Sequence, residues 1–467
     1  MSALRRHIPT SAAAAGAGAL VGMAVALATL PLMLLLGLAG AGALLLLLRE
    51  RTLWAVALVL FAALPLAYLP VPDIVLTVSP PALVLLALLL RVLVDRSSPV
   101  LRVLSGPAVP VLLLAGWLAL TALASPYRAI TVGWYVSFAT LVVLPALLAT
   151  RDPEVRIVVS RTWIAVAAVL GMYALAEAFV LQGNPLFGVF YARGDLVQKW
   201  SVYRATTSLG HPVSNGSFFA IAVPLALAAA LQHRSGLAAA AAVLSAGGVV
   251  ASGSRSGLAA MLVGAGLVVL RPIPGRRTGG APVGKLIGAA ALTLALVLGS
   301  AYLAVRDSSS EGSDSAAFRV TQIPVALRGV AASPILGIGP GAASFSQESL
   351  LARIGGAGAF ESFWLELVVG AGIPGLVLGA VVVLAALRAA LRSGAPGVAG
   401  AVVAWTVSAS FVNALEGGRP ESLVLGLVLA LALSGAGRPS AGSGMLMLRY
   451  AHDVGEPGLR ERKAAPP

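Results

Sequence analysis

The chain of 467 residues contains no cysteine and only four histidines, and charged residues make up only 11% of it. The absence of cysteine excludes a disulfide framework and a thiol nucleophile. The four histidines are scattered along the sequence and do not form a metal cluster, so we expect neither a metal nor another cofactor. A soluble domain carries about 25% charged residues. The shortage of charge therefore excludes a soluble globular enzyme.

Hydrophobic residues take the place of the missing charge. They make up 58% of the chain, and the mean hydropathy is +0.94. A helix needs about 20 apolar residues to cross the hydrocarbon core of a bilayer. Runs of this length predict an all-α, polytopic transmembrane protein. We expect about fourteen spans, at residues 11–30, 31–48, 52–70, 74–94, 107–124, 130–150, 157–180, 213–231, 236–251, 256–270, 285–305, 361–386, 396–415 and 420–436.

The net charge of +14 arises from 32 basic and 18 acidic residues, and their distribution indicates the topology. Cytoplasmic loops of membrane proteins carry an excess of Lys and Arg. When the N-terminus is placed inside, 22 of the 32 basic residues fall on the cytoplasmic side. The sequence therefore predicts that both termini lie inside. The basic charge serves membrane insertion, and we expect no nucleic-acid partner.

The predicted spans divide the chain into four parts. Residues 1–31 are expected to be a signal anchor, because Arg5 and Arg6 precede an apolar run without a convincing cleavage site. The C-terminal tail is rich in Gly, Pro and Ser and is expected to be disordered. The parts are N-terminal spans at 1–203, a core at 204–386 that includes a long outer loop at 306–360, C-terminal spans at 387–436 and a cytoplasmic tail at 437–467.

Polar side chains are costly in a membrane protein, so their clusters indicate function. Three regions predicted to face outward hold most of them: residues 181–215, the turn at 252–257 and the loop at 306–360. The Ser/Gly-rich turn allows two interpretations. Its small residues would let a phosphate approach Arg255 and the adjacent helix start. Alternatively, it is an ordinary capped turn whose arginine extends toward the interface.

The outer loop is predicted to begin as a solvated linker at residues 307–317 and then to form an amphipathic helix from Phe318. Arg319 and Gln322 share one face of this helix. Arg328 lies on the opposite side, since each residue turns a helix by about 100°. One helix cannot direct both arginines at one ligand, and we choose Arg319.

The second half of the loop carries helix-breaking residues. Ser333 and Pro334 are predicted to end the helix, and the glycine-rich residues 337–341 form a tight turn. A nucleotide-binding loop is not indicated, because no strand precedes the turn and no Lys-Ser/Thr follows it. A second amphipathic segment at 342–354 is expected to lead back to the membrane.

Glu361 stands where the outer loop is expected to meet an apolar helix. A carboxylate in the first turn is stabilised by the helix dipole, and this alone would account for it. The functional interpretation is a partly desolvated general base that faces the outer leaflet. Glu366 is five residues further on and about 140° around the helix, so the two carboxylates do not form a natural pair. A two-carboxylate glycosidase site is therefore not indicated.

Taken in their order along the chain, these features resemble the superfamily of O-antigen ligases and O-antigen polymerases, over roughly residues 204–376. The resemblance depends on the order of several short motifs rather than on one. They are the stretch from Arg204 through His211 to Asn215, the Ser-Arg-Ser-Gly turn at 254–257, the Phe-Arg pair at 318–319, the Ser-Pro-Ile-Leu-Gly-Ile-Gly-Pro-Gly run at 333–341, the acid-Ser-aromatic start at 361–363 and the run from Leu365 to Leu376.

This resemblance implies a metal-independent glycosyltransferase, a polysaccharide ligase or polymerase, in the cytoplasmic membrane with its active site facing outside. The donor would be a glycan on a polyprenyl-diphosphate carrier, and the acceptor a hydroxyl of a glycan or lipid. By analogy, Arg255 and Arg319 hold the diphosphate and Glu361 is the catalytic residue. Ligases of the family have a histidine where this chain has Glu361, which favours polymerase-like or other transfer over ligation to lipid A. Glu361 would then either act as the base or orient the acceptor. Candidate substrate contacts are Arg204, His211, Asn215, Ser254, Gln322 and Ser362.

Three other functions compete with this interpretation. A polytopic lipid or polysaccharide transporter or flippase would usually show repeats and charges at the midplane of the bilayer. In the outer half of the predicted spans, Glu177 is the one acid outside the candidate site. Another class of polyprenyl-dependent glycosyltransferase would usually place an acidic pair in the first outer loop, where residues 70–73 offer one acid. A non-catalytic scaffold is the third alternative.

Overall fold

The computed structural model describes residues 48–63, 79–94, 106–185, 202–271, 310–353, 359–412 and 421–434. Within these ranges every regular element is a helix, which confirms the predicted all-α fold. The elements are α3 (Glu50–Ala63), α4 (Pro80–Val94), η2 (Gly106–Ala108), α5 (Val109–Ala124), α6 (Arg128–Phe138), η3 (Ala139–Val143), α7 (Leu144–Ala149), α8 (Glu154–Leu175), η4 (Ala176–Leu181), α10 (Pro212–His233), α11 (Gly236–Ala251), α12 (Arg255–Leu270), α14 (Ser310–Ala332), α15 (Ala343–Arg353), α16 (Phe363–Arg392), α17 (Pro396–Ala409) and α18 (Glu421–Leu433).

The helices coincide with the predicted spans wherever the structure describes them. Five stretches are long and apolar enough to cross a membrane: Gly106–Ala124, Arg128–Ala149, Glu154–Leu181, Pro212–His233 and Phe363–Arg392. These helices establish a multi-pass membrane protein. The span expected at 11–30, most of that at 31–48 and that at 285–305 lie outside the described residues, as do the signal anchor and the C-terminal tail. The total of about fourteen spans and the inside position of the termini stay predictions.

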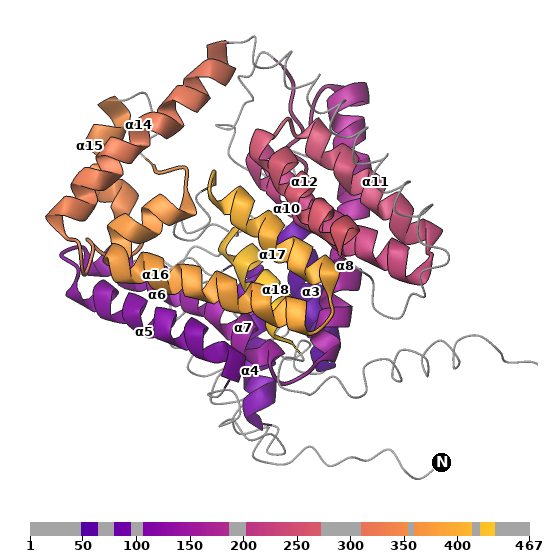
Figure 1. Cartoon of the computed structure of the whole chain (residues 1–467), viewed down its shortest axis with the longest axis horizontal. Coiled ribbons are helices and arrows are strands. Elements are labelled where there is room, and N and C mark those ends of the chain that lie inside the picture. The colour runs from indigo at the N-terminus through magenta and orange to yellow at the C-terminus, as the bar shows by residue number, and fades with distance from the viewer. Residues whose placement is uncertain are drawn as a thin grey trace, which may run out of the picture.

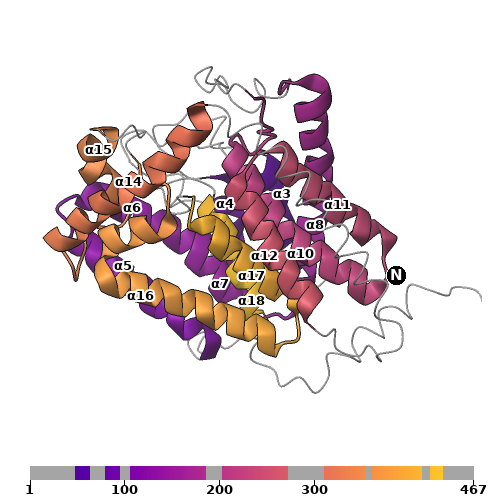
Figure 2. The same ribbon diagram turned by 45° about the horizontal axis from the view of Figure 1, so that its top comes forward.

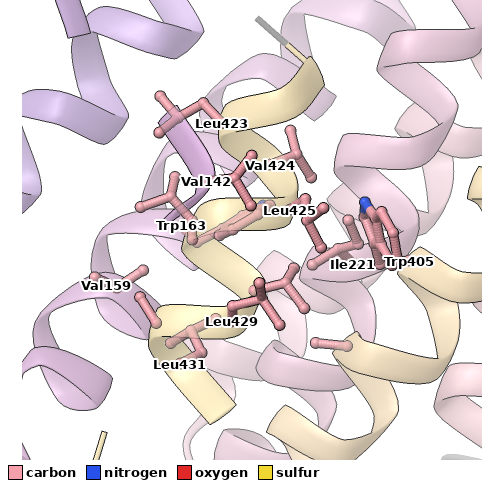
Figure 3. Packing of buried hydrophobic residues seen from close by; sticks show 14 of the residues in the cluster. Val142, Val159, Trp163, Ile221, Trp405, Leu423, Val424, Leu425, Leu429 and Leu431 are labelled. Carbon is pink, nitrogen blue, oxygen red and sulfur yellow. The ribbon is translucent and has the colours of Figure 1, made fainter. Parts of the chain in front are cut away.

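Helix α18 lies in the middle of the apolar core. Every residue from Ser422 to Ser434 is buried. The helix packs among α7, α8, α16 and α17. Figure 3 shows side chains of η3, α8, α10 and α17 around it, including those of Val142, Trp163 and Trp405. Helices within a bilayer associate mainly through such close van der Waals packing.

Glycine lets some of these helices approach very closely. A Cβ on Gly264 of α12 would lie 2.7 Å from the carbonyl oxygen of Gly400 on α17, and a Cβ on Gly400 would lie 2.6 Å from that of Gly264. Only glycine at both positions allows the two backbones to touch. Much of the high glycine content therefore serves helix packing.

Helix α16 is broken at Gly372, where φ is 70° and ψ is −175°. A side chain is strained in this conformation, and a Cβ on Gly372 would lie only 2.0 Å from the carbonyl oxygen of Ile335. Pro374 follows the break and lacks the backbone N–H that would continue the ladder. At the break, backbone groups of α16 lack partners within the helix and can bond to the loop that follows α14.

That loop satisfies the carbonyl groups that the break exposes. The backbone N–H groups of Ile338 and Gly339 donate to Val369 and Gly370 over 3.1 and 2.8 Å, the indole N–H of Trp117 donates to Ala371 over 2.8 Å, and the N–H of Ile373 donates back to Pro334 over 2.9 Å. Buried backbone polar groups need such partners, above all in a membrane. The glycine-rich turn therefore docks onto α16.

The prediction of a solvated linker at 307–317 is wrong from Ser310 onward, because α14 already begins there. The acidic residues Glu311 and Asp314 lie near the helix N-terminus, where the helix dipole favours negative charge. The predicted end at Ser333 is confirmed, and α15 confirms the second amphipathic segment. In both ribbon views α14 and α15 lie together on the side of the molecule away from α8 and α11 (Figures 1 and 2).

Candidate active site

Arg319 and Glu361 form an ion pair. The Nε atom of Arg319 lies 3.0 Å from Oε2 of Glu361, and the two side chains are 24% and 42% exposed. Both of these atoms are buried, and neither has an aligned hydrogen bond within the part of the chain that the structure describes. The contact is thus a close charge pair at the surface of the protein, between the outer loop and the start of α16.

Gln322 holds the backbone of Glu361. Its side chain is only 1% exposed, and its Oε1 atom accepts a 2.8 Å hydrogen bond from the backbone N–H of Glu361. Arg319 and Gln322 thus share one face of α14, as predicted, because both side chains contact Glu361. The Nε2 atom of Gln322 is buried and has no hydrogen-bond partner among the described residues. A buried donor of this kind is costly unless an acceptor meets it.

Glu361 lies outside the first turn of α16. The helix begins at Phe363 with Ser362 as N-cap, so the predicted start at 361 is wrong by two residues. The simple structural explanation, stabilisation by the helix dipole in the first turn, therefore does not account for Glu361. It applies to Glu366, which lies in that turn. The side chain of Ser362 makes no capping bond, and the backbone N–H of Phe363 donates to Val412 over 3.0 Å. That bond ties the start of α16 to the end of α17.

Ser344 links the outer loop to Glu366. Its hydroxyl donates to Oε2 of Glu366 over 2.8 Å and accepts a 3.0 Å hydrogen bond from the backbone N–H of Phe360. Glu366 is only 3% exposed, and Phe360 is fully buried. Glu366 thus holds the residue before Glu361 in place, although it does not pair with Glu361. The sequence offered no signal for Ser344, because its partner becomes apparent only when α15 packs against α16.

The Ser/Gly-rich turn is a capped helix start. Ser254 is the N-cap of α12, and its hydroxyl accepts a 3.1 Å hydrogen bond from the N–H of Gly257. A Cβ on Gly257 would lie 2.8 Å from the backbone of Gly216, and a Cβ on Gly216 would lie 2.4 Å from Cβ of Ser254. The small residues therefore let α12 pack against α10. Arg255, the first residue of the helix, is partly exposed.

A series of contacts connects the turn before α12 to the start of α16. Gly216, next to Ser254, lies in the second turn of α10, where the hydroxyl of Ser217 bonds to that of Ser408 on α17. The hydroxyl of Ser410, just after α17, accepts a 3.2 Å hydrogen bond from the indole N–H of Trp364 on α16. The starts of α10, α12 and α16 and the end of α17 therefore meet at one end of the helix bundle. Arg255 is the first residue of α12, and Glu361, which pairs with Arg319, stands two residues before α16.

Residues 240–380 match the family described as O-antigen ligase. This part of the chain, about 30% of its length, is similar to O-antigen ligases. The match extends from α11 into α16 and contains Arg255, Arg319 and Glu361. The resemblance predicted from the motifs is confirmed over these residues, whereas residues 204–239 lie outside the match. No curated protein matches the chain.

The match supports a membrane enzyme of the O-antigen ligase and polymerase type. The matched residues contain the outer loop, the turn at Arg255 and the start of α16. Helices α3 to α10 precede the match and α17 and α18 follow it, and they supply the apolar frame around it.

Three candidate contacts precede the matched residues and have structural partners. The Nε atom of Arg204 donates to the carbonyl of Ser252 over 3.0 Å, and Arg204 is only 5% exposed. His211 is the exposed N-cap of α10, and its Nδ1 accepts from the N–H of Val213. Asn215 is fully buried and donates to the carbonyl of Ala205 over 2.8 Å. These contacts attach the segment at 204–215 to the protein frame.

Proposed function

We propose that this protein transfers a glycan from a polyprenyl-diphosphate carrier to an acceptor hydroxyl at the outer face of the cytoplasmic membrane. The observation that carries the proposal is the pairing of Arg319 with Glu361 within the residues that match the O-antigen ligase family. A guanidinium group is suited to a diphosphate because it makes charge-assisted, often bidentate hydrogen bonds. A carboxylate beside it is suited to accept a proton from a hydroxyl.

The proposed reaction is a single displacement. The acceptor oxygen attacks the anomeric carbon of the donor sugar while the bond from that carbon to the diphosphate oxygen breaks. The proton of the acceptor hydroxyl passes to the carboxylate of Glu361, and the carrier leaves as a diphosphate. Arg255 and Arg319 stabilise the negative charge that develops on the leaving group. A displacement of this kind inverts the configuration at the anomeric carbon, and it requires no metal.

The ion pair also indicates how donor binding prepares the base. The carboxylate of Glu361 and a phosphate of the donor compete for the same guanidinium of Arg319. When the diphosphate binds Arg319, it weakens the pairing that holds the charge of Glu361, and the carboxylate becomes available for the acceptor proton. The remaining exposure of both side chains leaves room for a ligand to reach them.

A gene-deletion experiment tests the proposal. Cells that lack the gene should accumulate a polyprenyl-diphosphate-linked glycan and lose the mature polysaccharide, as measured by mass spectrometry of extracted lipids. The wild-type gene should restore both, whereas Arg319→Ala and Glu361→Gln should not. Matched controls are Arg328→Ala on the same helix and Glu348→Gln, an exposed acid of the outer loop. Full restoration by Arg319→Ala and Glu361→Gln, or a deletion without accumulated donor, would contradict the proposal.

The transporter or flippase remains the alternative that the composition allows. Glu177, the in-span acid that such a protein would use, accepts four hydrogen bonds from Tyr203, Thr206 and Thr207. A carboxylate engaged in this way is poorly placed to bind and release a transported ion. A transfer reaction with purified protein separates the two functions, because a flippase moves the glycan carrier across the membrane but forms no product from donor and acceptor.

A further inference from the structure

Glu177 is a buried carboxylate that the proposed reaction does not use. It lies in η4, a π-helical turn at the end of α8, and its side chain is fully buried. Its Oε1 atom accepts hydrogen bonds from the hydroxyl of Tyr203 at 2.9 Å and from the N–H and hydroxyl of Thr206 at 2.7 and 2.9 Å. Its Oε2 atom accepts a 2.9 Å bond from the N–H of Thr207.

Both side-chain oxygens of Glu177 serve as acceptors in this arrangement. A buried carboxylate is costly unless it is fully hydrogen-bonded, and an ionised carboxylate is an acceptor on both oxygens. Donors approach both oxygens of Glu177, from Tyr203 and Thr206 on one side and Thr207 on the other. A glutamine in its place would direct its amide N–H at one of these donors. Glu177 therefore determines the position of residues 203–207.

The segment that Glu177 holds is also fixed internally. Thr207 adopts a left-handed backbone conformation with φ of 44°, which is strained for a β-branched residue. Its hydroxyl donates to Oδ1 of Asn215 over 2.7 Å, and the side-chain amide of Asn215 donates to the carbonyl of Ala205. The segment is thus a rigid body between η4 and the start of α10.

The same segment binds the turn that leads to Arg255. The N–H of Ala205 donates to the carbonyl of Ala251 over 2.9 Å, and the Nε atom of Arg204 donates to the carbonyl of Ser252 over 3.0 Å. Both carbonyls belong to the end of α11, a few residues before Arg255. The hydrogen bonds therefore form a continuous connection from Glu177 to Ser252, which lies three residues before Arg255.

We propose that Glu177 is a positioning residue for donor binding, which holds Arg255 in place through residues 203–207 and the turn at 251–254. The inference rests on the proposed function, in which Arg255 binds the diphosphate. Glu177 itself does not touch the donor.

A binding titration with farnesyl diphosphate, a short isoprenyl diphosphate, tests this inference on the full-length protein in lipid nanodiscs. Glu177→Gln should raise the dissociation constant at least about tenfold, since hydrogen bonds to a charged group are lost. The fraction of protein that binds should stay as in the wild type. Glu348→Gln removes the same charge from an exposed position and should leave the affinity unchanged. A lower binding fraction with unchanged affinity would indicate a merely structural role and overturn the inference.

A double-mutant cycle gives the decisive comparison. If Glu177 acts through Arg255, Glu177→Gln should cost less than about twofold in affinity when Arg255 is already alanine. An equal cost in both backgrounds would contradict the inference. If Glu177→Gln does not fold, Tyr203→Phe, which removes one donor to the carboxylate, should show the same dependence with a smaller factor. Failure of the wild type to bind, or full binding by Arg255→Ala, would instead refute the proposed function.

Discussion

Arg255 and Arg319, the two candidate phosphate ligands, are held in place by different kinds of structure. Arg255 begins a helix, and the residues that shape its turn are immediate neighbours in the sequence, such as the capping Ser254 and Gly257. Arg319 meets Glu361 across the outer loop, with Gln322 reaching 39 positions along the chain to the same residue. The first site depends on its own cap and on the segment at 203–207, both outside the outer loop, and the second depends on how the outer loop docks onto α16.

This difference indicates where each site is vulnerable. The turn at Arg255 should tolerate changes in the outer loop, because its packing partner is α10. The Arg319–Glu361 pair should be lost when either the break in α16 or the Ser344 contact is removed, since both hold the loop against the helix.

The largest effect is expected from Gly372→Ala. The new Cβ would face the carbonyl oxygen of Ile335 at 2.0 Å in a backbone conformation that alanine rarely adopts. We expect a loss of about 3 kcal/mol or more, with the loop separated from α16. Thermal unfolding of the purified protein in detergent measures it. Gly266→Ala is the matched control, because open space surrounds Gly266 in α12; a similar loss in both variants would contradict the role of the break.

The next effect concerns the two members of the ion pair, which should act in opposite directions on donor binding. Arg319→Ala should weaken the binding of farnesyl diphosphate about tenfold or more, because a charge-assisted contact is lost. Glu361→Gln should strengthen it, because the carboxylate no longer competes for Arg319. Arg328→Ala and Glu348→Gln are the charge-matched controls. Weaker binding by Glu361→Gln would show that Glu361 orients Arg319 rather than competing for it.

A smaller effect is expected from Ser344→Ala. The substitution removes the hydroxyl that joins Glu366 to the N–H of Phe360, at a cost of about 1–3 kcal/mol. Transfer should fall, and the binding of farnesyl diphosphate should weaken by less than in Arg319→Ala, because Arg255 remains in position. Ser346→Ala on the same helix removes a hydroxyl that bonds only locally, to Ala343, and serves as control. Equal activities of the two variants would show that the Ser344 hydroxyl does not contribute to transfer.

The mildest change introduces single cysteines into a chain that has none. Ser346→Cys in the outer loop should react with a membrane-impermeant thiol reagent in intact cells. His233→Cys, at the exposed last residue of α10, should react only after the membrane is opened. The labelling is measured by mass shift on a gel. Protection of Ser346→Cys in intact cells would reverse the orientation and place the site inside.

The elements of the fold were predictable because each depends on residues close together in the sequence. Apolar runs predicted the helices, Ser333 and Pro334 predicted the end of α14, and the helical spacing of Arg319 and Gln322 predicted their common face. Residues 307–317 were predicted to be a linker because they are polar. That prediction left out that acidic residues are favourable at the start of a helix, and α14 begins at Ser310.

The contacts of the site were predictable only in part. The sequence named Arg319 and Glu361 separately, but their contact depends on the break at Gly372 and on the loop that docks there. The role of Ser344 depends on the same packing. Glu177 was recognised as an acid in a span, yet its donors come from a distant segment whose path no local rule predicts.

A transfer reaction with purified protein tests the central claim most directly. The donor is the polyprenyl-diphosphate-linked glycan extracted from cells that lack the gene, and the acceptor is the membrane fraction of the same cells. The account predicts that the wild-type protein forms the mature glycan and releases polyprenyl diphosphate, and that Glu361→Gln loses about a hundredfold or more of this rate. A Glu361→Gln protein with the wild-type rate, or product formed equally without added protein, would contradict it.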